Sequence, residues 1–506
     1  MSDSLRSLDL SQLNVDDATR QLLQRLLNHI ETLEAENQAL REENQRLSDE
    51  VARLKGQKPK PQFKANRPAG DASGPAPQPP SASAKPKPPA SSRVPRAERI
   101  KIDRDQVVSL DRSQLPADFQ SAGYRAVVIQ NLQVRTDNVC YRLERGSSAS
   151  TGQFYEARLP PALQGESFGR ELQAFVLTLS FELRVPEEKI WELLNTQEIV
   201  ISAGQISNIL TQKHLALFAA ERQAILAAGL ETTRYQQIDD TALRVKGVNH
   251  QLTVVGNPFF ACFFIRRHKN WQTVAALFEV ERLDAAAAEP AQADAPAHAA
   301  EPAAPLALKA LREAVLILLS DDAGQFANQT AHHALCWVHA ERHFAKLQPY
   351  FEAHQKLLDA FRTELWAYYE QLKAFKLQPT ETEKARLSHA FDELFGRVTG
   401  YAELDRRSAL TRANKAELLL VLDFPEVPLE NNLMERDLRE GVVKRKISSG
   451  PRGPDGAYAW EVFLTLLATC RKNGVNFFAY LCDRISQLNQ APPLAGLLRA
   501  HAPTGF

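Results

Sequence analysis

Leucine recurs at every seventh position near the start of the chain, at Leu26, Leu33, Leu40, Leu47 and Leu54. The core positions between them hold Leu23, Ile30, Asn37, Asn44 and Val51. This is the a and d pattern of a coiled coil, and asparagine at two a positions favours a parallel pair of helices. After a tail at 1–20 we therefore predict a leucine zipper over 21–55 and a homodimer formed through 23–54. The alternative is one amphipathic helix packed against its own domain.

Proline, alanine, serine and lysine dominate residues 56–100, a composition that buries too little apolar surface to fold. Between Lys58 and Lys101 there are ten basic residues against two acids, Asp71 and Glu98. We predict a disordered basic linker that either holds the phosphate backbone of DNA nonspecifically or serves only as a spacer. A second stretch rich in alanine and proline, 284–306, is predicted to be a loop inside a domain.

Short alternating stretches over 101–160 predict a small β module, because they are bounded by Asp, Asn, Gly and Ser. The pattern then becomes helical, with Pro186 opening one helix and Ser202 the next. These helices predict a helix-turn-helix-like DNA-binding unit over 161–228, with Gln205, Ser207 and Asn208 as its candidate groove-facing residues. Ordinary packing of three helices is the alternative.

The length of 506 residues predicts several folded units, and equal numbers of basic and acidic residues, 61 each, exclude a uniformly basic DNA binder. The five cysteines contain no C-x-x-C pair, so neither a disulfide framework nor a zinc ribbon is predicted. The longest strongly apolar run, Phe259 to Ile265, is too short to cross a bilayer. We expect a soluble protein of a reducing cytoplasm that is not associated with a membrane.

Two predicted strands each end in a pair of aspartates. The segment RYQQIDDTALRV contains Asp239 and Asp240, and two further strands follow it as in an antiparallel meander. The nearly continuous apolar run of AVLILLSDDAG, typical of a strand buried on both faces, leads into Asp321 and Asp322. These strands and the surrounding helices predict an α/β fold in which carboxylates gather at strand ends.

A third candidate acid lies on a predicted helix, PLENNLMERDLREGVVKRK. Asn431, Glu435 and Arg439 are four apart and share a face, with Asn432 beside them. Three carboxylates among cationic side chains suit phosphodiester cleavage by two Mg²⁺ ions about 3.5 to 4 Å apart. The alternative is that these acids are turn formers and salt-bridge partners.

Several motifs resemble the insertion sequence 66 family of bacterial transposases. They are DDT at Asp239, SDDAG at Ser320, CWVHAERHF at Cys336, ENNLMERDLREGVVKRK at Glu430 and NGVNFFAYL at Asn473. The resemblance implies an RNase H-like catalytic domain over 229–445, with a helical insertion at 345–424 and a C-terminal helical region at 446–506. It also implies that Asp239, Asp321 and Glu435 are the catalytic residues and hold Mg²⁺, or Mn²⁺ as an alternative.

His339 and Arg342 share a helix face close to the strand of the second acid, where His339 either orients a phosphate or is a core residue. The candidates for positioning DNA are Asn431, Asn432, Arg436, Arg439, Lys444, Lys446, His339 and Arg342. Cys336 and His339 have the spacing of metal ligands, but no second pair accompanies them, so zinc is not predicted. Members of this family often carry a cysteine zinc motif after the zipper, and here that region has Cys140 alone.

The resemblance implies a transposase that cleaves the ends of its own mobile element and joins the freed 3′-hydroxyls to target DNA. It also implies a bacterial protein that associates with the nucleoid. Its partners would be the terminal inverted repeats, target DNA, a second copy of the chain and, as further candidates, accessory proteins of the same element. The alternative from another class is a catalytically inactive, transposase-derived repressor. A nuclease or resolvase on the same fold would share the site and differ only in the strand-transfer step.

Overall fold

The computed structural model describes residues 15–54, 100–111, 123–132, 134–160, 163–278 and 315–501. The chain divides into two compact units, one formed by 1–42 with 139–506 and the other by 43–138. The predicted loop at 284–306 lies outside the described residues, as does the predicted linker apart from residue 100. Among the described helices, none is long and apolar enough to cross a membrane.

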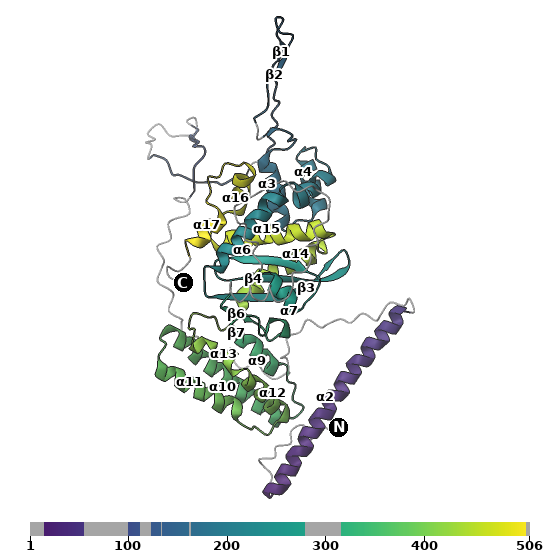
Figure 1. Ribbon diagram of the computed structural model, residues 1–506, viewed down its shortest axis with the longest axis vertical. Helices are drawn as coiled ribbons and strands as arrows, with labels where there is room; N and C mark the ends of the chain where they lie inside the picture. The colour runs from purple at the N-terminus through teal and green to yellow at the C-terminus, as the bar shows by residue number, and fades with distance from the viewer. Residues whose placement is uncertain are drawn as a thin grey trace. The chain divides into compact units, whose positions relative to one another are not determined.

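A five-stranded mixed sheet forms the centre of the larger unit (Figure 1). Its strands are β3 (Tyr235–Val245), β4 (Val248–Gly256), β5 (Ala261–Arg266), β6 (Ile317–Ser320) and β7 (His332–Leu335). Their order is β5-β4-β3-β6-β7, with the first three antiparallel and β3, β6 and β7 parallel. The antiparallel meander and the α/β class agree with the prediction from sequence.

The turn between β3 and β4 needs only two residues, Lys246 and Gly247. Both have positive φ, 48° and 80°. This is the left-handed conformation that two-residue hairpins require, since it matches the twist of the flanking strands. The hairpin carries β3 well past Asp239, so this acid lies in the middle of β3 and not at its end. The continuation of the strand past Asp239 was not evident from the pattern, because polar residues also alternate along a half-exposed strand.

Helices from the C-terminal third cover the sheet. They are α14 (Asn432–Ser448), α15 (Pro454–Lys472), α16 (Phe477–Ile485) and α17 (Leu494–Arg499). α14 packs on β3 and β4, and α15 packs on β5. A side chain at Gly441 would overlap the side chain of Leu252 on β4, so glycine allows α14 to approach the sheet closely. The short helix α7 (Trp271–Ala276), which follows β5 in the chain, contacts the 3₁₀ turn η6 (Gly324–Phe326), which follows β6.

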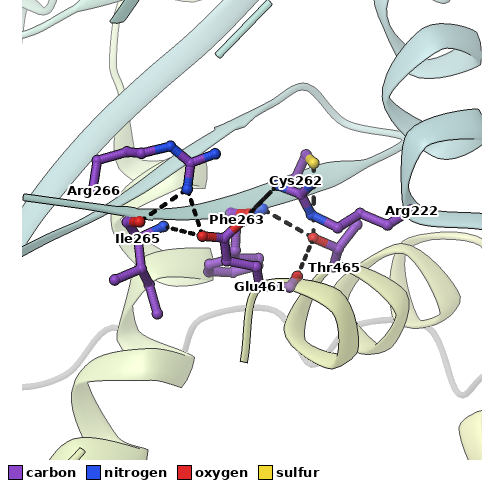
Figure 2. Close-up of polar contacts among 7 residues, drawn as sticks. All are labelled: Arg222, Cys262, Phe263, Ile265, Arg266, Glu461 and Thr465. Carbon is purple, nitrogen blue, oxygen red and sulfur yellow. Dashed lines mark hydrogen bonds and ion pairs between the residues drawn. The ribbon is translucent and has the colours of Figure 1, made fainter. Parts of the chain in front are cut away.

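Side chains from neighbouring helices bond the free edge of β5 (Figure 2). The N–H groups of Phe263 and Ile265 donate to Thr465 Oγ1 and Glu461 Oε1, at 2.9 and 2.8 Å. Arg222 donates to the carbonyl of Phe263 at 2.7 Å and pairs with Glu461 at 3.1 Å. An unpaired strand edge is a site for association with other strands, and here buried side chains of α6 (Leu215–Leu230) and α15 take the place of a sixth strand.

Residues 337–422 form a helical layer with its own core. Its elements are α9 (Trp337–Ala345), α10 (Glu352–Leu377), α11 (Glu381–Gly396), α12 (Ala402–Ala413), α13 (Lys415–Leu418) and the 3₁₀ turn η7 (Leu420–Leu422). Trp337, Phe344 and Phe391 are fully buried in this core. Leu420 packs with Ile317 and Leu319 of β6, so the layer, which includes the predicted helical insertion, rests on the sheet beside β7 (Figure 1).

The N-terminal part of the chain contains one long helix, α2 (Asp17–Leu54). The predicted β module at 101–160 is wrong in most of its extent. In its described residues only β1 (Arg145–Ser147) and β2 (Phe154–Glu156) form a short hairpin, and all six residues are exposed. Alternation of apolar residues suggested strands, but most of the large apolar side chains among the described residues of this segment are exposed, and they form no core that could hold a sheet together.

The helical unit that follows packs into the main core. It contains α3 (Arg170–Phe181), α4 (Glu187–Thr196), α5 (Ala203–Asn208), a single π-helical turn at Ile209–Lys213, and α6. Pro186 and Ser202 cap α4 and α5 as the sequence indicated, and Ser202 forms a capping box with Gln205. Gln205 and Asn208 are exposed and Ser207 is half-buried, so these residues remain candidates for DNA contact.

Candidate functional site

Two adjacent parallel strands bring together Asp239, on β3, and Asp321, just after β6. The register of β3 and β6 pairs Tyr235 with Ile317 and Gln237 with Leu319. Two residues further along, the same register brings Asp239 opposite Asp321, which follows β6 directly. Neighbouring strands lie about 4.8 Å apart, so the two carboxylates belong to one site.

The two acids of each pair have different partners, because successive side chains point to opposite faces of a strand. Asp240 pairs with Lys269 at 2.7 Å and accepts from Gln325 at 3.0 Å. Asp322 pairs with His343 at 2.7 Å. Within the described part of the chain, Asp239 and Asp321 form no ion pair, and each accepts a backbone N–H instead, from Asp240 at 2.8 Å and from Ala323 at 3.1 Å.

The N-terminus of α14 is anchored between β3 and α9. Asn431, its N-cap residue, is completely buried and donates through Nδ2 to the carbonyl of Ile238 at 2.8 Å. The backbone N–H of Asn431 donates to Cys336 Sγ at 3.2 Å, and Gln237 bonds the carbonyl of Glu430 at 3.0 Å. Asn431 was a candidate for DNA contact, and this prediction is wrong. The residue shares a face with Glu435 as expected, but that face meets the sheet at this turn.

Glu435 stands in the first turn of α14, where it meets two side chains of α9. Arg342 holds it with two hydrogen bonds, 2.9 Å from Nη1 to Oε1 and 3.3 Å from Nη2 to Oε2. His339 Nε2 lies 3.4 Å from the same carboxylate and 3.0 Å from Arg342 Nη1. His339 and Arg342 therefore share a face beside the acids, as the sequence predicted, and both are engaged with Glu435.

The electrostatic field of the site acts most strongly on Asp239. Burial raises the pKa of Asp239 to about 7, and the nearby Asp321, Asp240 and Glu435 raise it further. The negative charges of three separate elements thus reach Asp239. His339 shows the opposite sign, since burial and the charge of Arg342 lower its pKa. A cation placed among these carboxylates would relieve the repulsion between them.

The carboxylates do not form a closed set of metal ligands in this arrangement. Among the described residues, no group of three or more His, Cys, Asp or Glu side chains is placed to hold a metal ion. The donors are of the right kind, since Mg²⁺ and Mn²⁺ prefer carboxylate oxygens. Arg342 distinguishes the three acids, because it pairs with Glu435 while Asp239 and Asp321 pair with no cationic side chain among the residues that the structure describes. Cys336 and His339 take no part in such a group either.

The remaining candidates for DNA contact fall into two classes. Lys444 is buried, and its Nζ donates to the carbonyl of Ser180 at 2.6 Å and lies 4.7 Å from the ring centre of Phe181. The prediction that Lys444 positions DNA is therefore wrong, because this side of α14 faces α3. Asn432 is half-buried, whereas the basic residues Arg436, Arg439 and Lys446 are exposed along α14.

The sequence did not reveal the partners of Asp240 and Asp322, the two aspartates that the motif match leaves out of the site. Nothing in the local pattern joins Asp322 to His343, or Asp240 to Lys269, because these contacts bridge different elements. The alternation of side chains along β3 was a usable signal, since it requires that only one of two consecutive aspartates faces a given side. Arg342 was selected for DNA, while its bidentate bond to Glu435 was not expected.

Comparison with known proteins identifies the segment that carries two of the three acids. Residues 303–459 match the sequence model of the Transposase IS66 family. The chain thus carries a domain of this family, and the resemblance inferred from its motifs is confirmed over that segment. Asp321 and Glu435 lie inside the matched range, and Asp239 lies before it.

Two proteins of Sinorhizobium fredii (strain NBRC 101917 / NGR234) are similar to this chain. The uncharacterized protein y4jO is 42% identical over 187 residues, which is 37% of this chain and 58% of the relative. The uncharacterized protein y4qI is 27% identical over 192 residues, 36% of this chain and 35% of the relative. The chain thus spans between about one third and three fifths of the curated relatives it matches.

Proposed function

We propose that this protein, which carries an IS66-family transposase domain, is a DNA transposase of the DDE type that acts in the bacterial cytoplasm. The observation that carries the proposal is the register of β3 and β6, which, extended by two residues, brings Asp239 beside Asp321. Glu435 is also near, since its charge helps to raise the pKa of Asp239. The proposed activity is cleavage at the ends of a mobile element followed by transfer of the freed 3′-hydroxyls to target DNA.

In the proposed mechanism Asp239, Asp321 and Glu435 hold divalent cations, with Mg²⁺ as the first candidate. Bound divalent cations would activate the attacking oxygen and stabilise the leaving 3′-oxygen of a phosphodiester. With its pKa raised to about 7, the carboxyl of Asp239 is only partly ionised near neutral pH, and a nearby positive charge would favour its ionised form. Arg342 would release Glu435 and turn to a phosphate of the DNA, since a guanidinium binds either oxyanion in the same forked geometry.

The exposed cations on α14 would then hold the DNA backbone. Arg436 and Arg439 lie one and four residues beyond Glu435, and Lys446 extends the line toward the end of the helix. Asn432 stands at the start of the same helix, whose N-terminus favours a negative phosphate. Because the chain has no net charge, strong phosphate contact is expected here and in the basic segment 56–100, and not over the whole surface.

The test is nicking and strand transfer by the full chain on a supercoiled plasmid that contains the DNA flanking its gene, with Mg²⁺ or Mn²⁺. Asp239→Asn, Asp321→Asn and Glu435→Gln should each abolish cleavage while DNA binding persists. Asp240→Asn and Asp322→Asn are matched controls, since they remove neighbouring carboxylates that pair with Lys269 and His343. Full activity in any of the first three variants would refute the triad.

A second candidate function is a transposase-derived DNA-binding repressor without catalysis. The ion pair between Arg342 and Glu435 supports it, because it leaves the described acids without a group of three metal ligands. The two functions differ in metal binding with DNA present. A catalytic protein binds Mn²⁺ in a manner that Glu435→Gln weakens, whereas a repressor binds its DNA equally well with a chelator and cuts none.

A further inference from the structure

The first turns of α2 lie on the helical layer and not in open solvent. Leu27 is buried against Phe351, just before α10, and together they form a small separate core. Leu23, Ile30 and Tyr350 pack around this pair. These contacts fall within one compact unit, because residues 1–42 cluster with 139–506.

A carboxylate of α2 is buried in the same contact. Glu31 is nearly inaccessible to solvent, and it accepts hydrogen bonds from the backbone N–H of Tyr350 and from His354 Nδ1, the latter at 3.0 Å. His354 is itself buried and stacks on Tyr401, with ring centres 4.5 Å apart. A buried carboxylate persists only with such partners, so Glu31 specifies one docked position of the helix.

Two amides of α2 bind the turn before α12. Gln24 Nε2 donates to the carbonyl of Gly400 at 2.7 Å, and it lies 3.1 Å from His354 Nε2. Asn28 donates to the same carbonyl at 3.0 Å and accepts from the N–H of Ala402 at 3.1 Å. Three polar residues, each one turn apart, therefore follow the apolar contact along one side of α2.

This contact uses residues that the leucine zipper also needs. Leu23 and Ile30 are the first two a positions of the heptad, and both are partly buried against the helical layer. The d positions Leu26, Leu33 and Leu40 remain exposed. A parallel zipper buries a and d together, so a helix docked in this way cannot form the complete seam over its first two heptads.

We propose that residues 23–31 of α2 dock on the helical layer of their own chain in competition with pairing to a second copy, so that the docked protein has a shortened zipper. The occupant of the exposed leucine stripe beyond Leu33 is a second copy of this chain. The proposal rests on the zipper dimer expected from the heptad. Docking also contacts the start of α12 through Ala402, and Arg407 of that helix lies 3.9 Å from Asp322, the residue that follows Asp321.

Two substitutions separate docking from the zipper. Leu27→Ala and Glu31→Ala remove docking contacts at e and b positions of the heptad, so they leave every a and d residue unchanged. Arg25→Ala is the matched control, since Arg25 is exposed on the same turn of the helix. The readouts are hydrogen exchange of the full-length chain and its dimer dissociation constant by analytical ultracentrifugation.

We expect both docking variants to exchange the amide of Tyr350 faster and to dimerise about tenfold more tightly, equivalent to ~1.4 kcal/mol, because Leu23 and Ile30 become available. Arg25→Ala should change neither readout. Unchanged exchange at Tyr350 would refute the docked contact, and weaker dimerisation would refute the competition. Loss of Tyr350 protection on dilution to monomer would refute docking within one chain.

The zipper itself is tested separately by Leu40→Lys, at a d position outside the docked segment. This variant should weaken the dimer while Tyr350 remains protected. If Leu40→Lys leaves association unchanged, the zipper is wrong and the competition with it. The failure of the proposed transposase function would appear elsewhere, in the plasmid assay, so the two results are distinguishable.

Discussion

Arg342 occupies the carboxylate that the proposed metal site requires, and replacing it with glutamine tests that reasoning. Its guanidinium forms two hydrogen bonds to Glu435, at 2.9 and 3.3 Å, and contacts His339 at 3.0 Å. Arg342→Gln removes the positive charge and keeps a polar side chain of moderate length. Without the arginine, a divalent cation no longer competes with an ion pair for Glu435, so metal affinity in the absence of DNA should rise.

The size of the expected change in metal affinity follows from the solvent exposure of the ion pair between Arg342 and Glu435. The side chains of Arg342 and Glu435 are 45% and 26% exposed. Ion pairs in such surroundings contribute about 0.2 to 1 kcal/mol, and two-pronged geometry favours the upper end. If metal binding no longer has to break an ion pair worth ~1 kcal/mol, the dissociation constant for the metal falls about fivefold.

The assay is a titration of the metal-free, full-length protein with Mn²⁺ in the absence of DNA. The free ion is measured by its electron paramagnetic resonance signal. The Asp239→Asn variant, which lacks one proposed ligand, measures how much Mn²⁺ binds elsewhere on the protein. Arg436→Gln serves as the control, since it removes an arginine from α14 that forms no described bond to Glu435. The Arg342→Gln variant should also nick DNA more slowly, because it lacks the phosphate contact. An equal or higher dissociation constant for Mn²⁺ in Arg342→Gln would refute the competition.

Three further predictions concern stability and DNA contact. Burial raises the pKa of Asp239 to about 7 in the folded protein, so its ionisation increasingly opposes folding as the pH rises from about 4 to 7. In thermal unfolding without metal, Asp239→Asn should therefore be more stable than wild type at pH 8 but not at pH 3.5. Glu461→Ala should lose about 3 to 5 kcal/mol of unfolding free energy in urea titration, because it leaves Arg222 buried without its acid. Lys446→Ala should weaken DNA binding and reduce its salt dependence by about one ion in filter binding, whereas Lys444→Met should lower stability and leave the salt dependence unchanged.

Each of these predictions has a defined contrary result. Equal stability of Asp239→Asn and wild type at pH 8 would contradict the raised pKa. Glu192→Ala removes an exposed ion pair and should lower the free energy of unfolding by less than about 1 kcal/mol. An equally small loss in Glu461→Ala would contradict the stabilising role of the contacts at the edge of β5. A reduced salt dependence in Lys444→Met would show that this lysine reaches DNA after all.

Much of the local structure was predictable from the periodicity of the sequence. The heptad predicts an uninterrupted helix over 21–55, and the structure has one helix at Asp17–Leu54. The run ILLS predicts a strand buried on both faces, and all four of its residues are buried in β6. The capping residues Pro186 and Ser202 predicted where two helices begin. These features depend on neighbours within a few residues, so a linear pattern contains the needed information. The same method failed for 101–160, because an alternating pattern describes a strand only where something covers its apolar face.

The sequence indicated which acids to consider for the candidate site, but not how they are bonded in the folded protein. Motifs singled out Asp239, Asp321 and Glu435, and only the register of β3 with β6 aligned the first two. The assignment of these residues as metal ligands stays a prediction. That Glu435 is bonded to Arg342 could not be predicted, because the two residues are joined through space by the packing of α9 beside α14.

Burial made the other decisive differences. Lys444 and Lys446 are two residues apart in one basic run, yet the first is buried against Phe181 and the second is exposed. Leu23 and Leu26 belong to the same heptad, and only Leu23 contacts the helical layer. The sequence by itself determined which residues share a face of a helix or strand, since 3.6 and 2 residues per repeat are local geometry. Only the tertiary structure decided what each face meets, because that depends on elements hundreds of residues away.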